Sequence, residues 1–149
     1  MKFSTKGRYG LRAMVDLAVH AKGDHVALYS IAERQGISTN YLEQVFSVLR
    51  KAGLVKSVKG AQGGYVLAED PSDIKVGRIL RALEGPLSVI DENAESSNGK
   101  ENAIQQCIKI VVWDKMNEAL NKLADSVTLE DLAENYRKLN GINDTMYYI

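Results

Sequence analysis

The side chains best suited to recognition chemistry lie at the start of one predicted helix. Glu43 can accept a hydrogen bond from a cytosine amino group, and Gln44 suits an adenine edge. Tyr41 can donate to a phosphate, while Ser38 and Asn40 can cap backbone amides and reach phosphate. Because helix starts favour acids, Glu43 also has a purely structural interpretation. This chemistry is non-covalent hydrogen bonding with no covalent step, and it favours recognition of a nucleic acid.

Basic residues and glycines follow this segment. Arg50 lies where the same helix ends, near the DNA backbone if the helix enters a groove by its first turn. Lys56 and Lys59 flank a glycine-rich turn that starts at Gly60 and can fold tightly. The glycine run lacks the Lys-Ser or Lys-Thr pair of a nucleotide-binding loop. Ser/His/Asp sets, Cys/His sets and paired catalytic acids are also missing, so we expect no enzyme and no catalytic residues.

The spacing of Ala32, Gly36 and Leu42 predicts the element that positions these side chains. A small residue at position 32 lets two helices cross closely, and glycine at position 36 adopts the positive φ of a tight turn. Leu42 then anchors the second helix beneath the first. The expected elements are helices over about 28–35 and 39–52 and a hairpin of strands over 54–57 and 65–68. This order is a winged helix-turn-helix, which lays one helix in the major groove of DNA.

Further helices are predicted from hydrophobic periodicity and from stop signals. Four are expected. The first begins at Ser4 or Thr5 and ends near residue 21, and the second covers 76–83. The third runs for about 20 residues from Ala103, and the fourth from Thr128 to about Leu139. The helix from Ala103 carries a wide apolar stripe, which Trp113 and Ile110 extend past one face, so it needs two surfaces to bury it. We expect one of them to be a second subunit, and burial within one chain is the alternative. The predicted dimerisation residues are Ile104, Ile108, Val111, Val112, Met116 and Leu120.

The predicted fold class is therefore mostly α with a small β wing: a winged helix-turn-helix plus a long dimerisation helix. The predicted domains are a DNA-binding domain over 1–85, a flexible acidic loop over 86–102, and a dimerisation helix with a C-terminal helix and tail over 103–149. Charge agrees with this division. Residues 1–67 carry ten Lys/Arg and four Asp/Glu, a net of +6, and residues 68–149 carry a net of −6. A basic half that holds the helix-turn-helix indicates phosphate binding, although chance segregation of surface charge is the alternative.

Composition fits a small intracellular regulator. The chain has 149 residues, of which 45% are hydrophobic, enough for a core. It contains neither an apolar run of membrane-spanning length nor an apolar signal region, so we expect no membrane association. A single cysteine suits a reducing cytosol, and we expect a cytoplasmic location.

Six segments, taken in order, resemble the Rrf2 family of bacterial dimeric winged-helix repressors. They are MKFSTKGRYGL (1–11), YLEQ (41–44), GLV (53–55), GAQGGY (60–65), LEGP (83–86) and TLEDL (128–132). The match covers nearly the whole chain. The resemblance implies a homodimer that is crossed through the long helix and bound to a partly palindromic operator in double-stranded DNA.

Many members of that family sense through an iron–sulfur cluster held by three cysteines in the loop before the long helix. This chain departs there, because Cys107 lies where the third ligand would fall and Glu101 where the preceding cysteine would be. A cluster takes about four soft ligands, and His20 and His25 lie elsewhere in the chain. We therefore expect no cofactor and no metal. Cys107 is expected to be a small buried hydrophobe, with a role as a thiol sensor as the alternative.

The ending Met146-Tyr147-Tyr148-Ile149 is similar to that of the family's subgroup of cysteine-metabolism repressors, which also lacks the three cysteines. The resemblance implies control of sulfur and cysteine genes. It also implies a partnership with cysteine synthase through Tyr148 and Ile149; a tail packed on the partner subunit is the alternative. We expect a DNA-binding repressor. The alternatives are an iron–sulfur or redox-responsive regulator of the same family and a regulatory partner of cysteine synthase.

Overall fold

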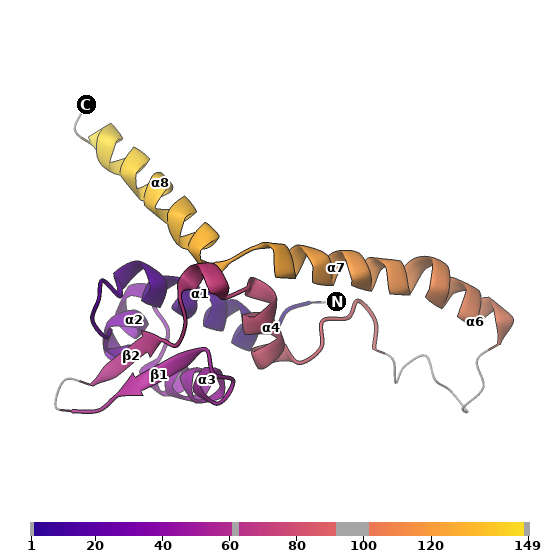
Figure 1. Ribbon diagram of the computed structural model, residues 1–149, viewed down its shortest axis with the longest axis horizontal. Helices are drawn as coiled ribbons and strands as arrows, with labels where there is room; N and C mark the ends of the chain where they lie inside the picture. Colours follow the sequence, from indigo (N-terminus) through magenta and orange to yellow (C-terminus); the bar gives the residue numbers. More distant parts are fainter. Residues whose placement is uncertain (1, 61–62, 92–101, 148–149) are drawn as a thin grey trace.

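The computed structural model describes residues 2–60, 63–91 and 102–147, with side chains as far as residue 141. Figure 1 shows a body built from α1 to α4 and a small sheet, from which two helical segments project in different directions. The body contains α1 (Thr5–His20), α2 (Leu28–Gln35), α3 (Thr39–Lys51), β1 (Val55–Val58), β2 (Gly64–Leu67), the short 3-10 helix η1 (Pro71–Asp73) and α4 (Val76–Glu84). The projecting segments are α6 (Ala103–Ile108), η3 (Lys109–Trp113) and α7 (Asp114–Ser126), which form one run, and α8 (Leu129–Tyr147). The predicted class, mostly helical with a small antiparallel sheet, is confirmed.

Helix α1 begins at a cap that two parts of the chain supply. The Ser4 hydroxyl accepts a hydrogen bond from the Gly7 amide, as helix N-caps do. The Glu84 carboxylate, at the end of α4, accepts from the backbone amides of Ser4 and Gly7 at 3.0 Å each. A side chain at Gly7 would collide with Glu84, so glycine permits this close approach. The end of α4 therefore fixes the start of α1, which gives Glu84 of the segment 83–86 a structural role.

One hydrophobic core joins the helices of the body. Its largest fully buried side chains come from α1, α2, α3 and α4 and from the segments between them; they include Met14, Leu17, Ile31, Leu42, Phe46, Leu49, Leu54, Ile74 and Ile79. The first turns of α8 also belong to this core, since Leu129 and Ala133 are fully buried there. Thr128 opens α8 as predicted: its hydroxyl accepts from the Asp131 amide, and the Asp131 carboxylate accepts from the Thr128 amide.

The sheet is a two-stranded antiparallel hairpin with Val55 opposite Leu67 and Val58 opposite Gly64. Both strands lie within one residue of the predicted positions. A backbone bridge that the sequence did not predict ties the hairpin to the segment before α2, because Val26 and Tyr65 exchange two hydrogen bonds of 2.9 Å. The hairpin is thereby held to the body at its second strand.

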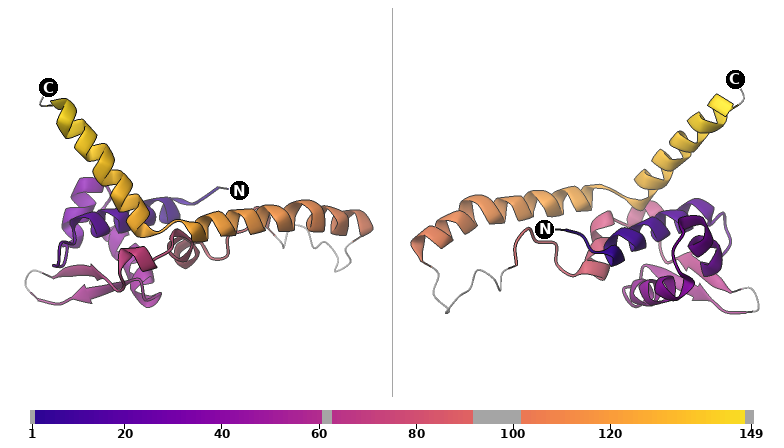
Figure 2. Two further views of the ribbon diagram at one scale, coloured as in Figure 1. Left: turned by 45° about the horizontal axis from the view of Figure 1, so that its top comes forward. Right: turned by 180° about the vertical axis from the view of Figure 1, so that it is seen from behind.

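The run α6–η3–α7 is the long helix expected from Ala103, and its middle is a π-helical segment. We call this run the arm; Figure 2 shows from two further sides that it extends away from the body. The prediction for the last helix was wrong at its end, because α8 continues past Leu139 to Tyr147. Asn140 and Gly141 lie inside it, since one glycine weakens a helix by only about 1 kcal/mol without ending it. Within the described ranges no helix is long and apolar enough to cross a membrane.

Candidate nucleic-acid interface

Helices α2 and α3 form the predicted helix-turn-helix. Gly36 ends α2 with φ of +64°, a left-handed conformation that glycine adopts without strain. The Ile37 amide then donates to the Ala32 carbonyl at 3.0 Å, which closes the turn. Ala32 and Leu42 are both buried where the helices meet. The local sequence therefore sets the angle at which α3 leaves the body.

Helix α3 presents a row of polar side chains on its outer face. Asn40, Glu43 and Gln44 are exposed, and together with Ser47 they line a shallow hollow of about 560 Å³. Ser47 was not predicted, although its spacing of four residues from Glu43 places it on the same face. The row combines hydroxyl, amide and carboxylate groups, so it can both donate to and accept from base edges.

The first turn of α3 holds two further predicted residues in structural contacts. The Ser38 hydroxyl accepts from the Tyr41 amide at 3.1 Å and so caps the helix. The Tyr41 ring packs edge-on against Tyr9 of α1, with ring centroids 6.1 Å apart. The guanidinium of Arg12 lies 5.0 Å from the centre of the Tyr9 ring. Tyr41 is thus half-buried and joins the start of α3 to α1.

The predicted basic residues lie at the end of α3 and on the hairpin that follows it. Arg50 is exposed in the last turn of α3, and Lys56 and Lys59 are exposed on the hairpin. Gly60 begins the turn with φ of +139°, while residues 61–62 lie outside the described ranges. A side chain at Gly64 would collide with the Val26 carbonyl, so that glycine permits the bridge described above. The hairpin can therefore act as a basic wing held at a fixed position.

A buried carboxylate that the sequence analysis missed locks α2 onto α1. Asp16 of α1 accepts from the Arg34 Nη2 at 2.7 Å and from the Gln35 Nε2 at 2.9 Å. Arg12, one turn earlier, donates to the Gln35 carbonyl. The hydrogen bond from Arg34 to Asp16 raises the pKa of Arg34 above its usual range. The available signal was an acid on the apolar side of α1, beside Leu17.

The predicted dimerisation residues lie along the arm and are largely uncovered in the single chain. Ile104 is 73% exposed, Val111 55% and Met116 47%. Ile108 and Val112 are also exposed, and Leu120 is half-buried. Cys107 is exposed as well, so the expectation of a buried thiol is not met within one chain. Such a surface is unusual for a single folded chain and indicates a missing contact.

Comparisons with known proteins agree with this geometry. Residues 3–135 match the Rrf2 family model, described as an iron-dependent transcriptional regulator. The chain belongs to the Rrf2 family of transcriptional regulators. It is 46% identical over 134 residues to CymR, an HTH-type transcriptional regulator of Bacillus subtilis (strain 168), over 89% of this chain and 90% of that one. It is 40% identical to IscR of Serratia proteamaculans (strain 568), over 91% of this chain and 80% of that regulator.

Solved structures of related regulators have the same fold. CymR, the global cysteine regulator of B. subtilis, superposes with a TM-score of 0.76 at 44% identity over 91% of this chain and 98% of that one. IscR of T. potens gives 0.72 at 48% identity, over 91% and 88% of the two chains. These relatives are transcriptional regulators and not enzymes, in agreement with the absence of an enzyme motif.

The donor set of this Rrf2 protein does not fit an iron–sulfur cluster. The sequence holds one cysteine, whereas a cluster takes about four soft ligands. No three His, Cys, Asp or Glu side chains in the described part of the chain converge as metal ligands do. His20 lies in α1, where it contacts the Asp16 carbonyl at 2.9 Å, far along the chain from Cys107. Glu101, Tyr148 and Ile149 lie outside the described residues.

Proposed function

We propose that this Rrf2 regulator binds operator DNA as a homodimer, with α3 in the major groove and the hairpin as a wing on the flanking backbone. The outer polar row of α3, formed by Asn40, Glu43, Gln44 and Ser47, carries the proposal. These side chains are free to reach base edges, and the buried face of the same helix fixes their direction. Ser38, Tyr41, Arg50, Lys56, Lys59 and Gly60 contact the phosphate backbone in this proposal.

The second subunit covers the arm in this proposal. Two arms that cross through Ile104, Ile108, Val111, Val112, Met116 and Leu120 would remove the exposed apolar stripe from water. A two-fold axis at that crossing would present two α3 helices to the same side of a duplex, so the operator would be partly palindromic. Residues 1–85 then serve as the DNA-binding domain, residues 103–149 as the dimerisation part, and residues 86–102 as the loop between them.

The similarity to the cysteine regulator CymR supports control of sulfur and cysteine genes. A partnership with cysteine synthase through Tyr148 and Ile149 is a second, separable proposal that rests on the sequence of the ending. An iron–sulfur role is the less favoured alternative, because one cysteine per chain supplies too few ligands. Anaerobic reconstitution with iron and sulfide distinguishes it: we expect a colourless protein, and visible absorbance that disappears in Cys107→Ser would restore the cluster role.

The DNA-binding proposal is tested in two steps. The wild-type protein first selects its operator from a pool of random duplexes, and each variant is then titrated against that operator. Glu43→Ala and Gln44→Ala should each weaken operator binding by about 1–3 kcal/mol and leave binding to random DNA unchanged. Glu33→Ala, an exposed acid of α2, is the matched control. Equal losses on operator and random DNA would mean that these residues only position the helix, and failure of the wild type to bind any duplex would overturn the proposal.

A further inference from the structure

The junction between the arm and the body is held at two separate attachment points. At the first, backbone hydrogen bonds tie the connection between α7 and α8 to the start of α4. The Val76 amide donates to the Val127 carbonyl at 2.8 Å, and the Leu129 amide donates to the Ile74 carbonyl at 2.8 Å. These bonds fix where α7 ends, but one attachment point does not fix the direction in which a helix leaves.

Arg81 supplies the second attachment point, higher on α4. Its two terminal nitrogens donate to the two carboxylate oxygens of Asp125 in α7, at 2.8 Å each. The same guanidinium donates to the Asn121 side-chain carbonyl, one turn earlier in α7, also at 2.8 Å. This planar fork fixes both distance and orientation, which a single charge could not do. The bond from Arg81 holds the pKa of Asp125 below its usual range.

Asn121 and Asn117 extend this contact to the chain that follows α4. The Asn121 amide donates to the Leu87 carbonyl at 3.0 Å, and the Asn117 side chain accepts from the Val89 amide at 2.7 Å. Gly77 of α4 faces the same place, and a side chain there would collide with Asp125. Three turns of α7 are thus held against α4 and the segment after it, whereas Ile104 and Ile108 of the exposed stripe lie further out on the arm.

The outer arm acts as a lever because Ile104 and Ile108, the dimer residues nearest its tip, lie far from this junction, whereas Leu120 lies beside it. Asn121 and Ile108 are 13 residues apart in a helical run, which corresponds to about 20 Å at 1.5 Å per residue. A rotation of about 10° at the junction therefore moves the outer arm by about 3.5 Å, close to the rise of one base pair. Small changes of the junction would alter the separation of the two α3 helices by about one base pair, which binding to operators of different half-site spacing can detect.

From this geometry we infer that Arg81, through Asn121 and Asp125, determines which half-site spacing the dimer accepts on DNA. The inference rests on the proposed dimeric function and adds to it specificity-determining residues that touch neither DNA nor the second subunit. A rigid junction allows one separation of the recognition helices. A loosened junction allows several, so the protein would still bind DNA but would discriminate less between spacings.

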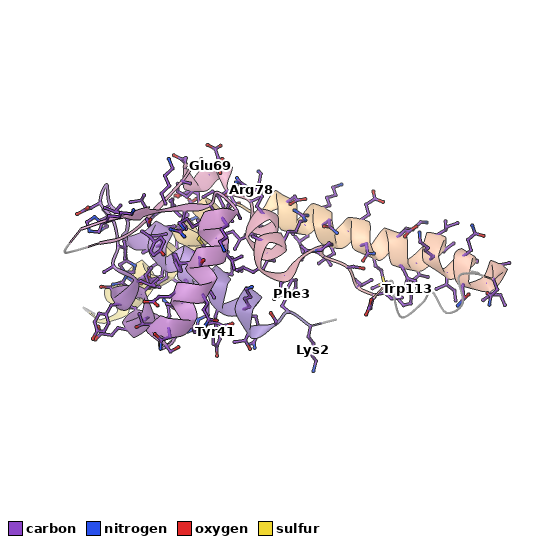
Figure 3. The ribbon with its side chains drawn as sticks, turned by 90° about the horizontal axis from the view of Figure 1, so that it is seen from below. Lys2, Phe3, Tyr41, Glu69, Arg78 and Trp113 are labelled. Atoms are coloured by element: carbon purple, nitrogen blue, oxygen red, sulfur yellow. The ribbon has the colours of Figure 1, made fainter. Side chains whose placement is uncertain are left out.

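The test uses full-length Arg81→Lys, which keeps the charge but loses the fork, and Gly77→Ala, which displaces Asp125 without removing either partner. Arg78→Lys is the matched control, because Arg78 also lies in α4 and pairs with Glu69 at 2.6 Å on the surface of the body, without contacting the arm. Figure 3 shows Arg78 and Glu69 together at one edge of the body, opposite the edge where Tyr41 lies. Each protein is titrated on selected operators whose half-site spacing is changed by one or two base pairs.

We expect the wild type and Arg78→Lys to lose about tenfold in affinity for each base pair of altered spacing. Arg81→Lys and Gly77→Ala should lose less than about threefold, while sedimentation shows unchanged dimers. Wild-type discrimination in both junction variants, or an equal loss of discrimination in Arg78→Lys, would overturn the inference. A wild type that binds as a monomer or ignores spacing would instead contradict the proposed dimeric function, and the inference with it.

Discussion

The body and the arm use the same apolar residue types in opposite environments. In the body, Met14, Leu42 and Phe46 are fully buried. In the arm, Ile104 is 73% exposed and Leu123 is 64% exposed, although both lie on an apolar stripe with helical spacing. The body therefore has a core of its own, whereas the arm presents an apolar surface that the single chain leaves uncovered.

This difference shows that an apolar stripe predicts a buried surface without saying which chain buries it. Burial of apolar area is favourable, by about 25 cal/mol per Å² within a chain, and it also favours association, where lost translational and rotational freedom offsets part of the gain. The body satisfies this within the chain, through α1, α3 and α4. If a second subunit covers the arm, as proposed, the stability of the arm depends on protein concentration.

The largest expected effect breaks the body and leaves the arm intact. Phe46→Ala removes a fully buried ring whose centroid lies 4.8 Å from that of Tyr65. It should lower the free energy of unfolding by about 3–5 kcal/mol at every protein concentration. Ile104→Ala on the arm is the matched variant, and chemical denaturation at two concentrations compares them. A concentration-dependent loss in Phe46→Ala would contradict a self-contained body core.

The next effect breaks the arm and leaves the body intact. Val112→Glu places an unpaired carboxylate in the proposed dimer contact, where its burial is costly. Operator affinity should fall by more than about tenfold, since single half-sites bind weakly, while circular dichroism stays helical. Gln106→Glu, which adds the same charge at an exposed position two residues from both Ile104 and Ile108 and so on another face of the arm, should leave affinity within about threefold. Equal affinities of Val112→Glu and the wild type would remove the arm from the dimer contact.

A smaller effect sharpens the contrast in charge between the two regions. Lys59→Ala on the hairpin should weaken binding to every sequence alike and reduce the slope of log affinity against log salt by about 0.9, the value for one phosphate contact. Lys122→Ala, an exposed lysine of α7, should leave that slope unchanged. Gel-shift titrations at several salt concentrations measure both, and equal changes in the two variants would contradict a DNA contact confined to the body.

The smallest effect concerns the junction in acid. Because the hydrogen bond from Arg81 lowers the pKa of Asp125 in the folded protein, this carboxylate stabilises the fold above its unfolded pKa of about 3.9. That contribution disappears as the pH falls through the lowered folded pKa. Thermal unfolding between pH 2 and 6 should therefore show a larger acid loss for the wild type than for Asp125→Asn. Parallel pH profiles would indicate that the pair contributes nothing to folding stability.

Local signals in the sequence predicted most of the body. The Ala32, Gly36 and Leu42 spacing located the helix-turn-helix, and Thr128 located the start of α8, because turns and caps depend on neighbouring residues. The polar row of α3 followed from one helix face, although Ser47 was missed. The end of α8 was placed too early, since glycine inside a helix is a weak stop signal.

Contacts between distant residues could not be predicted in the same way. Asp16 meets Arg34 and Gln35 only when α1 crosses α2, and Arg81 meets Asp125 across 44 residues. Ion pairs of this kind leave no periodic pattern in one sequence. The junction and the lock of α2 on α1 therefore emerged only from the fold, while the partner that covers the arm stays a prediction.

Sedimentation equilibrium of the wild-type protein at micromolar concentration tests the central claim most directly. The claim is that the body folds alone while the arm is completed by a second copy of the chain. We predict a single species of twice the 16.4 kDa chain mass, without larger assemblies. A well-folded 16.4 kDa monomer under these conditions would contradict the dimer, the palindromic operator and the role of the junction together.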